Sequence, residues 1–170
     1  MTRKFVHMSV VGDKELIKKL GELGGRVYKR VVSQASRKAF TPVVKTAKQL
    51  APTDTGQLRK SIGVKQKKYP RAGRIVTLVG PRTGFAISIE RETPLGKRKT
   101  KRDPVKYGHL VEFGTSAHMI LVDMKDGAYE HPGSAAQPFM RPAFDGNINR
   151  SKQIMKSELA AGVIREAKRK

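Results

Sequence analysis

The chain has 170 residues, a length that suits one domain, and it contains no cysteine, which excludes disulfides, thiolate metal sites and cysteine nucleophiles. Its 36 Lys and Arg side chains outnumber 14 Asp and Glu, giving a net charge of +22. Such a field attracts polyanions and repels further copies of the same chain.

The first half of the chain predicts one strand and one long helix. Residues 5–11 alternate in polarity and predict a short strand. From Leu16 to Leu50, apolar side chains recur every three or four residues, which is typical of an amphipathic helix. We expect the glycine pair at 24–25 to loosen this helix and Pro42 to kink or restart it.

Three strand candidates follow the helix, at residues 61–67, 74–80 and 85–90. In the third, apolar and small or polar side chains alternate, the pattern of a half-buried strand. Loops rich in Gly and Pro separate the three candidates, as expected for strands joined by turns.

The remaining segments predict loops, a strand and a final helix. Residues 91–106 hold seven Lys or Arg without apolar periodicity, so we expect an exposed basic loop. Residues 107–115 are interpreted as a strand running into a glycine turn, and 123–138 as an irregular loop. A last helix is expected to begin near Pro142. The fold class is therefore α+β in a single domain: a long N-terminal amphipathic helix on a small antiparallel sheet, with a C-terminal helix.

The search for catalytic or metal chemistry favours neither. A cluster of His109, Glu112, His118, Asp123 and His131 is conceivable as a metal site. On a strand, however, residues three apart point to opposite faces, and no spacing fits a known zinc motif. The chain also lacks a G-x-S-x-G elbow, a P-loop and a dinucleotide fingerprint. We therefore expect no catalytic residue, no metal, no cofactor and no enzymatic activity.

Contacts with nucleic acid are expected to be made to phosphates. Aromatic residues make up only 6% and no recognition motif is present, so sequence-specific readout is not indicated. The alternative for the same side chains is a solvated surface. The candidate DNA or partner contacts are Lys97, Arg98, Lys99, Lys101, Arg102, Lys65, Lys67, Lys68, Arg71 and Arg74.

Three segments in order resemble one family. They are residues 51–62 (APTDTGQLRKSI), 107–115 (YGHLVEFGT) and 137–144 (QPFMRPAF). After an amphipathic helix and before a terminal one, they are similar to the tail-completion and head–tail joining proteins of long-tailed phages, typified by gene product ten of phage HK-ninety-seven. The basic segment 91–106 and a second insert near 123–133 depart from the expected pattern.

The resemblance implies a structural role for the three segments. Asp54 and Gly56 would set the turn from helix to sheet, and the segment ending at Thr115 would close a strand with Phe113 buried. Residues 138–142 would wedge the last helix against the sheet. The structural residues implied in this way are Pro52, Asp54, Thr55, Gly56, Leu58, Glu112, Phe113, Gly114, Thr115, Pro138, Phe139, Arg141 and Pro142.

The resemblance also implies partners and a location. Members would form a homo-oligomeric ring at the neck of the virion, beside head-closure and tail-terminator proteins and around packaged double-stranded DNA. No signal peptide or membrane-spanning run is evident, so synthesis in the host cytoplasm without membrane contact is expected. Two alternatives remain open: a nonspecific basic nucleic-acid-binding protein, and a head-closure or tail-terminator ring subunit.

Overall fold

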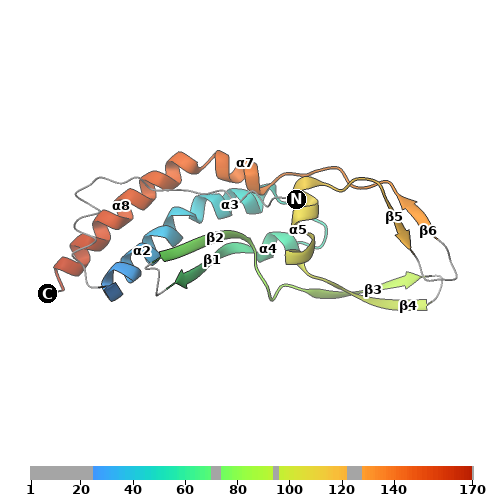
Figure 1. Ribbon diagram of the computed structural model, residues 1–170, viewed down its shortest axis with the longest axis horizontal. Coiled ribbons are helices and arrows are strands. Elements are labelled where there is room, and N and C mark those ends of the chain that lie inside the picture. The colour runs from blue at the N-terminus through green and yellow to red at the C-terminus, as the bar shows by residue number, and fades with distance from the viewer. Residues whose placement is uncertain (1–24, 70–73, 94–95, 122–127, 170) are drawn as a thin grey trace. The chain divides into compact units, whose positions relative to one another are not determined.

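The computed structural model describes residues 25–69, 74–93, 96–121 and 128–169, so the expected strand at 5–11 and the helix before residue 25 lie outside the described residues. Helices and strands are mixed along the chain, which confirms the α+β class (Figure 1). The elements are α2 (Gly25–Ala39), α3 (Thr41–Leu50), α4 (Gln57–Ser61), β1 (Ile62–Tyr69), β2 (Arg74–Pro81), β3 (Ile87–Thr93), β4 (Gly96–Arg102), α5 (Pro104–Phe113), β5 (His118–Leu121), β6 (Ala128–His131), α7 (Met140–Asp145) and α8 (Ile148–Ala167).

The long helix restarts where Pro42 predicted. α2 ends at Ala39 and α3 begins at Thr41, so Pro42 lies in the first turn of α3, where its missing N–H removes no helical hydrogen bond. The apolar stripe continues through the break, with Val43 and Ala47 buried on α3. The helix signal is therefore correct on both sides of the proline.

The strands form three separate pairs among the described residues, where one small sheet was expected. β1 pairs with β2, β3 with β4, and β5 with β6. The β3–β4 and β5–β6 pairs are antiparallel, with Ile87 opposite Arg102 and His118 opposite His131. The three predicted strands at 61–67, 74–80 and 85–90 correspond to β1, β2 and β3.

Two sequence predictions in the middle of the chain are wrong. The described residues of 91–106 are not a loop, because 91–93 complete β3, 96–102 form β4 and 104–106 begin α5. Residues 107–115 are not a strand, because 107–113 form most of α5. In the predicted irregular segment 123–138, residues 128–131 form β6.

The described chain divides into two compact units. The first contains the residues up to Thr41, those within 66–77 and those from Asn149, while the second contains Pro42–Lys65 and Leu78–Ile148. The single-domain expectation stays a prediction.

The core of the first unit lies where α8 runs beside α2 (Figure 1). Its buried side chains are Val31, Ala35, Ala39, Met155 and Leu159. Alanines on α2 let the helix backbones approach closely, because their side chains occupy little of the space between two helices.

Polar contacts attach β1 and α8 to α2 within this unit. The Gln66 side chain accepts from Ser33 Oγ at 2.6 Å and donates to Ser33 O at 2.8 Å and to Ser36 Oγ at 2.9 Å. On the helix pair, Lys38 Nζ lies 2.8 Å from a Glu158 carboxylate oxygen. The half-buried amide of Gln66 contributes more to holding the elements together, because exposed ion pairs contribute little to stability.

Gly162 of α8 sits directly against Val31 of α2. A Cβ at position 162 would lie 2.4 Å from Val31 Cγ1. We expect Gly162→Ala to lower the free energy of unfolding by about 1 kcal/mol, because overpacking of about 1–3 kcal/mol outweighs the helix propensity of about 1 kcal/mol that alanine gains. Denaturant unfolding measures the difference.

Gly25→Ala is the matched control, since a Cβ there meets nothing within 4 Å. Combining Gly162→Ala with Val31→Ala should recover most of the loss attributable to the clash. A Gly162→Ala protein more stable than the parent would show that helix propensity outweighs the contact.

Candidate functional site

Helix α5 is the centre of the second unit, and its start is set by Asp103 and Pro104. The Val105 N–H donates to the Asp103 carboxylate at 3.1 Å, and Pro104 occupies the first turn, which is a favourable helix start. Pro104, Gly108 and Glu112 recur every four residues and form the buried face. This periodicity is helical, and it places Glu112 inside the unit.

The Glu112 carboxylate holds the start of α7. The backbone N–H groups of Phe139, Met140 and Arg141 donate to it at 2.8, 2.8 and 2.9 Å, and Glu112 is 8% exposed. The first N–H groups of a helix have no partner within that helix, and their partial positive charge favours a carboxylate. Glu112 therefore caps a helix that begins 28 residues later in the chain.

Further backbone bonds join the same two segments. Gln137 N–H donates to Val111 O at 2.8 Å, and Thr115 and Ser134 exchange two N–H···O bonds at 2.9 and 3.0 Å. Gly114 follows the helix with φ 70°, and a Cβ there would lie 2.6 Å from Ser134 O. A glycine at position 114 is therefore required both by the backbone angle and by the close approach.

The third segment packs onto the buried face of α5. Gly56 has φ 72° and precedes α4, while Leu58 of α4 is 4% exposed. A Cβ on Gly108 would lie 3.5 Å from Leu58 Cδ1 and 3.0 Å from Pro81 Cγ. Segments 51–62, 107–115 and 137–144, which lie far apart in the sequence, thus meet around α5.

An open hollow of about 680 Å³ lies beside α5 in the second unit. Residues of all three segments line it, including Gly56, Leu58, Leu110 and Gln137. Its lining as a whole is Pro52, Asp54, Thr55, Gly56, Leu58, Lys101, Arg102, Asp103, Lys106, Tyr107, Leu110, Val111, Thr115, His118, His131, Ser134, Ala135 and Gln137.

Charged groups at the hollow are only partly paired. Arg102 Nη1 lies 2.8 Å from Asp54 Oδ2, an exposed contact of small energetic weight. Burial raises the pKa of the Tyr107 phenol above 10.0, the Arg102 guanidinium lowers that pKa in part, and the Asp54 and Asp103 carboxylates raise it. Tyr107 therefore carries an O–H group at neutral pH, since its pKa lies above the ordinary value.

The first group of predicted basic contacts lies on a strand. Lys97, Lys99 and Lys101 alternate along β4 and are exposed, so they point the same way. Lys99 pairs with Glu90 of β3 at 3.3 Å, while Lys97 and Lys101 make no ion pair with any described residue. The side chain of Arg98 lies outside the described residues.

The second group lies on or beyond β1. Lys65, Lys67 and Lys68 are exposed on that strand, and Lys67 Nζ lies 5.1 Å from the centre of the Tyr69 ring. Arg71 and the side chain of Arg74 lie outside the described residues.

The predicted environment of Phe113 at the end of α5 is wrong. Phe113, expected to be buried, is 76% exposed, whereas its neighbour Glu112 is the buried residue. Residues 138–142 were expected to wedge the last helix against the sheet. In this segment Phe139 is 1% exposed, whereas Pro138 and Pro142 are exposed. The Asp-Pro pair at 103–104 is the sequence signal that would have identified the helix.

Two of the histidines that suggested a metal cluster lie close together. His118 and His131 face each other across β5 and β6 with ring centroids 5.1 Å apart, while Asp123 lies outside the described residues. In the described parts of the chain, no three His, Asp or Glu side chains come together as a metal site. No helix within those parts is both long and apolar enough to span a membrane.

A family model described as "HK97-gp10_like: Bacteriophage HK97-gp10, putative tail-component" matches residues 14–114. The match covers more than half of the chain and includes the first segment and all of the second except Thr115. No match was found among curated proteins or among solved structures.

The Glu112 contact makes a direct prediction. Glu112→Gln should lower the free energy of unfolding by about 2 kcal/mol or more, because hydrogen bonds to a charged acceptor contribute about 1.5–3 kcal/mol and a neutral amide presents only one acceptor oxygen. Thermal and denaturant unfolding measure the loss. Glu130→Gln, an exposed change on β6, serves as the matched control and should leave stability unchanged. Equal stabilities of the two variants would contradict the capping role.

Proposed function

The chain belongs to the HK97-gp10-like family of phage tail components, and from this premise we propose that it is a structural subunit of the tail-completion or neck complex. In this role it joins the tail to the head as part of a homo-oligomeric ring around the DNA channel. Head-closure and tail-terminator proteins are its neighbours in the virion, and it has no enzymatic activity.

The observation that carries this proposal is that segments 51–62, 107–115 and 137–144 contact one another around α5 and hold the second unit together. Glu112 accepts hydrogen bonds from three backbone N–H groups, and at Gly114 the backbone of Ser134 comes too close for a Cβ. Residues in such contacts maintain the fold, and they offer no unengaged functional group that could act in catalysis. A rigid frame with exposed basic and apolar surfaces is what an assembly subunit requires.

The net charge supports a position close to DNA. A ring of subunits, each with a charge of +22, produces a strongly positive rim or lumen. Lys97 and Lys101 on β4 are available for phosphates, since neither is paired with a described residue. Such contacts are independent of sequence, which suits a channel that any part of a genome can occupy.

A second candidate function is favoured by the same charge. A nonspecific nucleic-acid-binding protein would bind duplex DNA tightly as a monomer, with a steep dependence on salt. A head-closure or tail-terminator ring subunit is a third possibility, which has the same neighbours. The phenotype of a phage lacking the protein separates all three.

The first test is genetic. Phage carrying a nonsense mutation in the gene for this chain should produce DNA-filled heads and separate tails that do not join, visible by electron microscopy of lysates. Supplying the intact chain from a plasmid should restore joined particles. Joined, infectious particles in the absence of the chain would contradict the proposal, whereas leaking heads or tails of abnormal length would favour head closure or tail termination.

The second test addresses the lysines of β4. Replacing Lys97, Lys99 and Lys101 with Ala should make the slope of log K against log salt for short duplex DNA less steep by about 2 to 3, because each phosphate contact contributes about 0.9. Binding is followed by fluorescence anisotropy. Ala at Lys45, Lys152 and Lys168, three exposed lysines elsewhere, gives a control of equal charge. Equal slopes for the two triple variants would exclude β4 as the phosphate-binding strand.

A further inference from the structure

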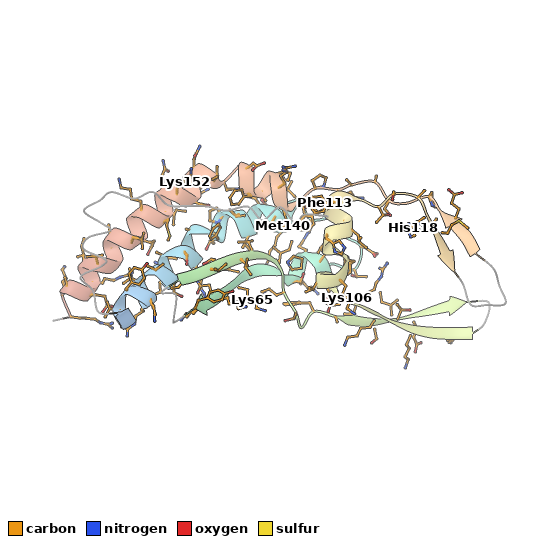
Figure 2. The ribbon with its side chains drawn as sticks, viewed as in Figure 1. Lys65, Lys106, Phe113, His118, Met140 and Lys152 are labelled. Carbon is orange, nitrogen blue, oxygen red and sulfur yellow. The ribbon has the colours of Figure 1, made fainter. Side chains whose placement is uncertain are left out.

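The outer face of α5 carries an exposed apolar surface. Lys106, His109, Leu110 and Phe113 are spaced by three or four residues, so they share one face of the helix, and all four are exposed. Phe113 is 76% exposed and Leu110 is 41% exposed. Figure 2 labels Phe113 and Lys106 near opposite ends of α5. The face therefore presents two large apolar side chains, with a basic residue at one end.

Phe113 is presented from a fixed backbone. The residue before it is held by three hydrogen bonds, and the residue after it, Gly114, lies so near the backbone of Ser134 and Ala136 that a Cβ would not fit. A large aromatic side chain on a rigid support loses little conformational entropy when a partner covers it. Aromatic anchors of this kind contribute a large share of the binding energy at interfaces.

The apolar surface continues from α5 into the hollow. Leu110 belongs to the exposed face and also lines the hollow of about 680 Å³, together with Leu58 and Val111. Leu110 thus lies on the wall of a concave surface with other apolar walls, and Phe113 lies one helical turn further along the same face of α5. An incoming side chain that entered the hollow would cover Leu110 and leave Phe113 to pack beside it.

The rim of this surface is basic. Three basic side chains, Lys101, Arg102 and Lys106, and two carboxylates, Asp54 and Asp103, line the hollow. Asp54 pairs with Arg102 and Asp103 accepts from the Val105 N–H, while Lys101 and Lys106 make no ion pair with any described residue. A partner with carboxylates at its edges would complement these two ammonium groups. A second copy of the chain, with a charge of +22, would bring mostly like charge to them.

We propose that this face of α5 and the hollow beside it bind an acidic segment of another virion protein, one that carries a large apolar side chain between its carboxylates. DNA is the less suitable occupant, because phosphates gain nothing from Leu110 and Phe113. The proposal rests on the proposed function, since it requires the chain to be part of a particle. It adds the location of the protein contact, which shares Lys101 with the lysines of β4, whereas Lys97 and Lys99 do not line the hollow.

Site-specific crosslinking in assembled particles tests this. The photoreactive residue p-benzoylphenylalanine replaces Phe113 in the full chain during infection, and the purified particles are irradiated. We expect one crosslink to a different virion protein, mapped by mass spectrometry to a segment rich in Asp and Glu. The same residue at position 152, an exposed site on α8, should not give that crosslink.

Other results would overturn the docking proposal and leave the proposed function intact. A crosslink from position 113 to DNA, to a second copy or to a basic segment would do so, as would the absence of any crosslink while the chain is present in the particles. Absence of the chain from purified particles would instead contradict the proposed function.

A pair of serine variants separates docking from folding. Phe113→Ser should reduce incorporation into particles by about tenfold or more, the size expected for an interface anchor, while the thermal midpoint of the isolated chain stays unchanged. Met119→Ser removes another exposed apolar side chain, 60% exposed on β5, and should leave incorporation unchanged. Equal incorporation of the two variants would overturn the role of Phe113.

Discussion

The carboxylate of Glu112 accepts three backbone N–H groups at the beginning of α7, and the second unit is arranged around this contact. The N–H groups at the start of a helix need an acceptor from elsewhere, and a buried carboxylate needs donors. Each satisfies the other, so neither α5 nor α7 could move away without leaving polar groups buried and unpaired. The contact therefore fixes the register between two segments that lie about 28 residues apart in the chain.

The same contact determines what the surface presents. With Glu112 turned inward, its neighbour Phe113 is directed outward, because consecutive residues of a helix lie about 100° apart around its axis. Gly114 then ends the helix in a backbone conformation that brings Thr115 against Ser134. The exposed position of the aromatic side chain is thus a consequence of the cap. This is why an assembly function and an internal hydrogen-bond network can use the same short stretch of sequence.

Acidic residues are scarce in this chain. Several of the described ones form ion pairs or hydrogen bonds with other residues of the chain. Glu158 and Glu166 pair with basic residues of α2 and α8 in the first unit. Asp103 caps α5, and Asp54 meets Arg102 in the second. Because these acids serve the fold, much of the excess positive charge stays at the surface, where it can act on partners. A charge of +22 also disfavours self-association, because copies of the chain repel one another.

The sequence by itself determined the elements whose signals are local. The apolar stripe, Pro42 and the alternating strands set α2, α3 and β1 to β3, and the order of three short segments indicated the family. The apolar residues of 107–113 fit a strand as well as a helix, and within the sequence the Asp-Pro pair at 103–104 is the feature that favours the helix. The sequence alone could not place Glu112 inside and Phe113 outside. That choice depends on three N–H groups from α7, which only the tertiary structure brings to the end of α5.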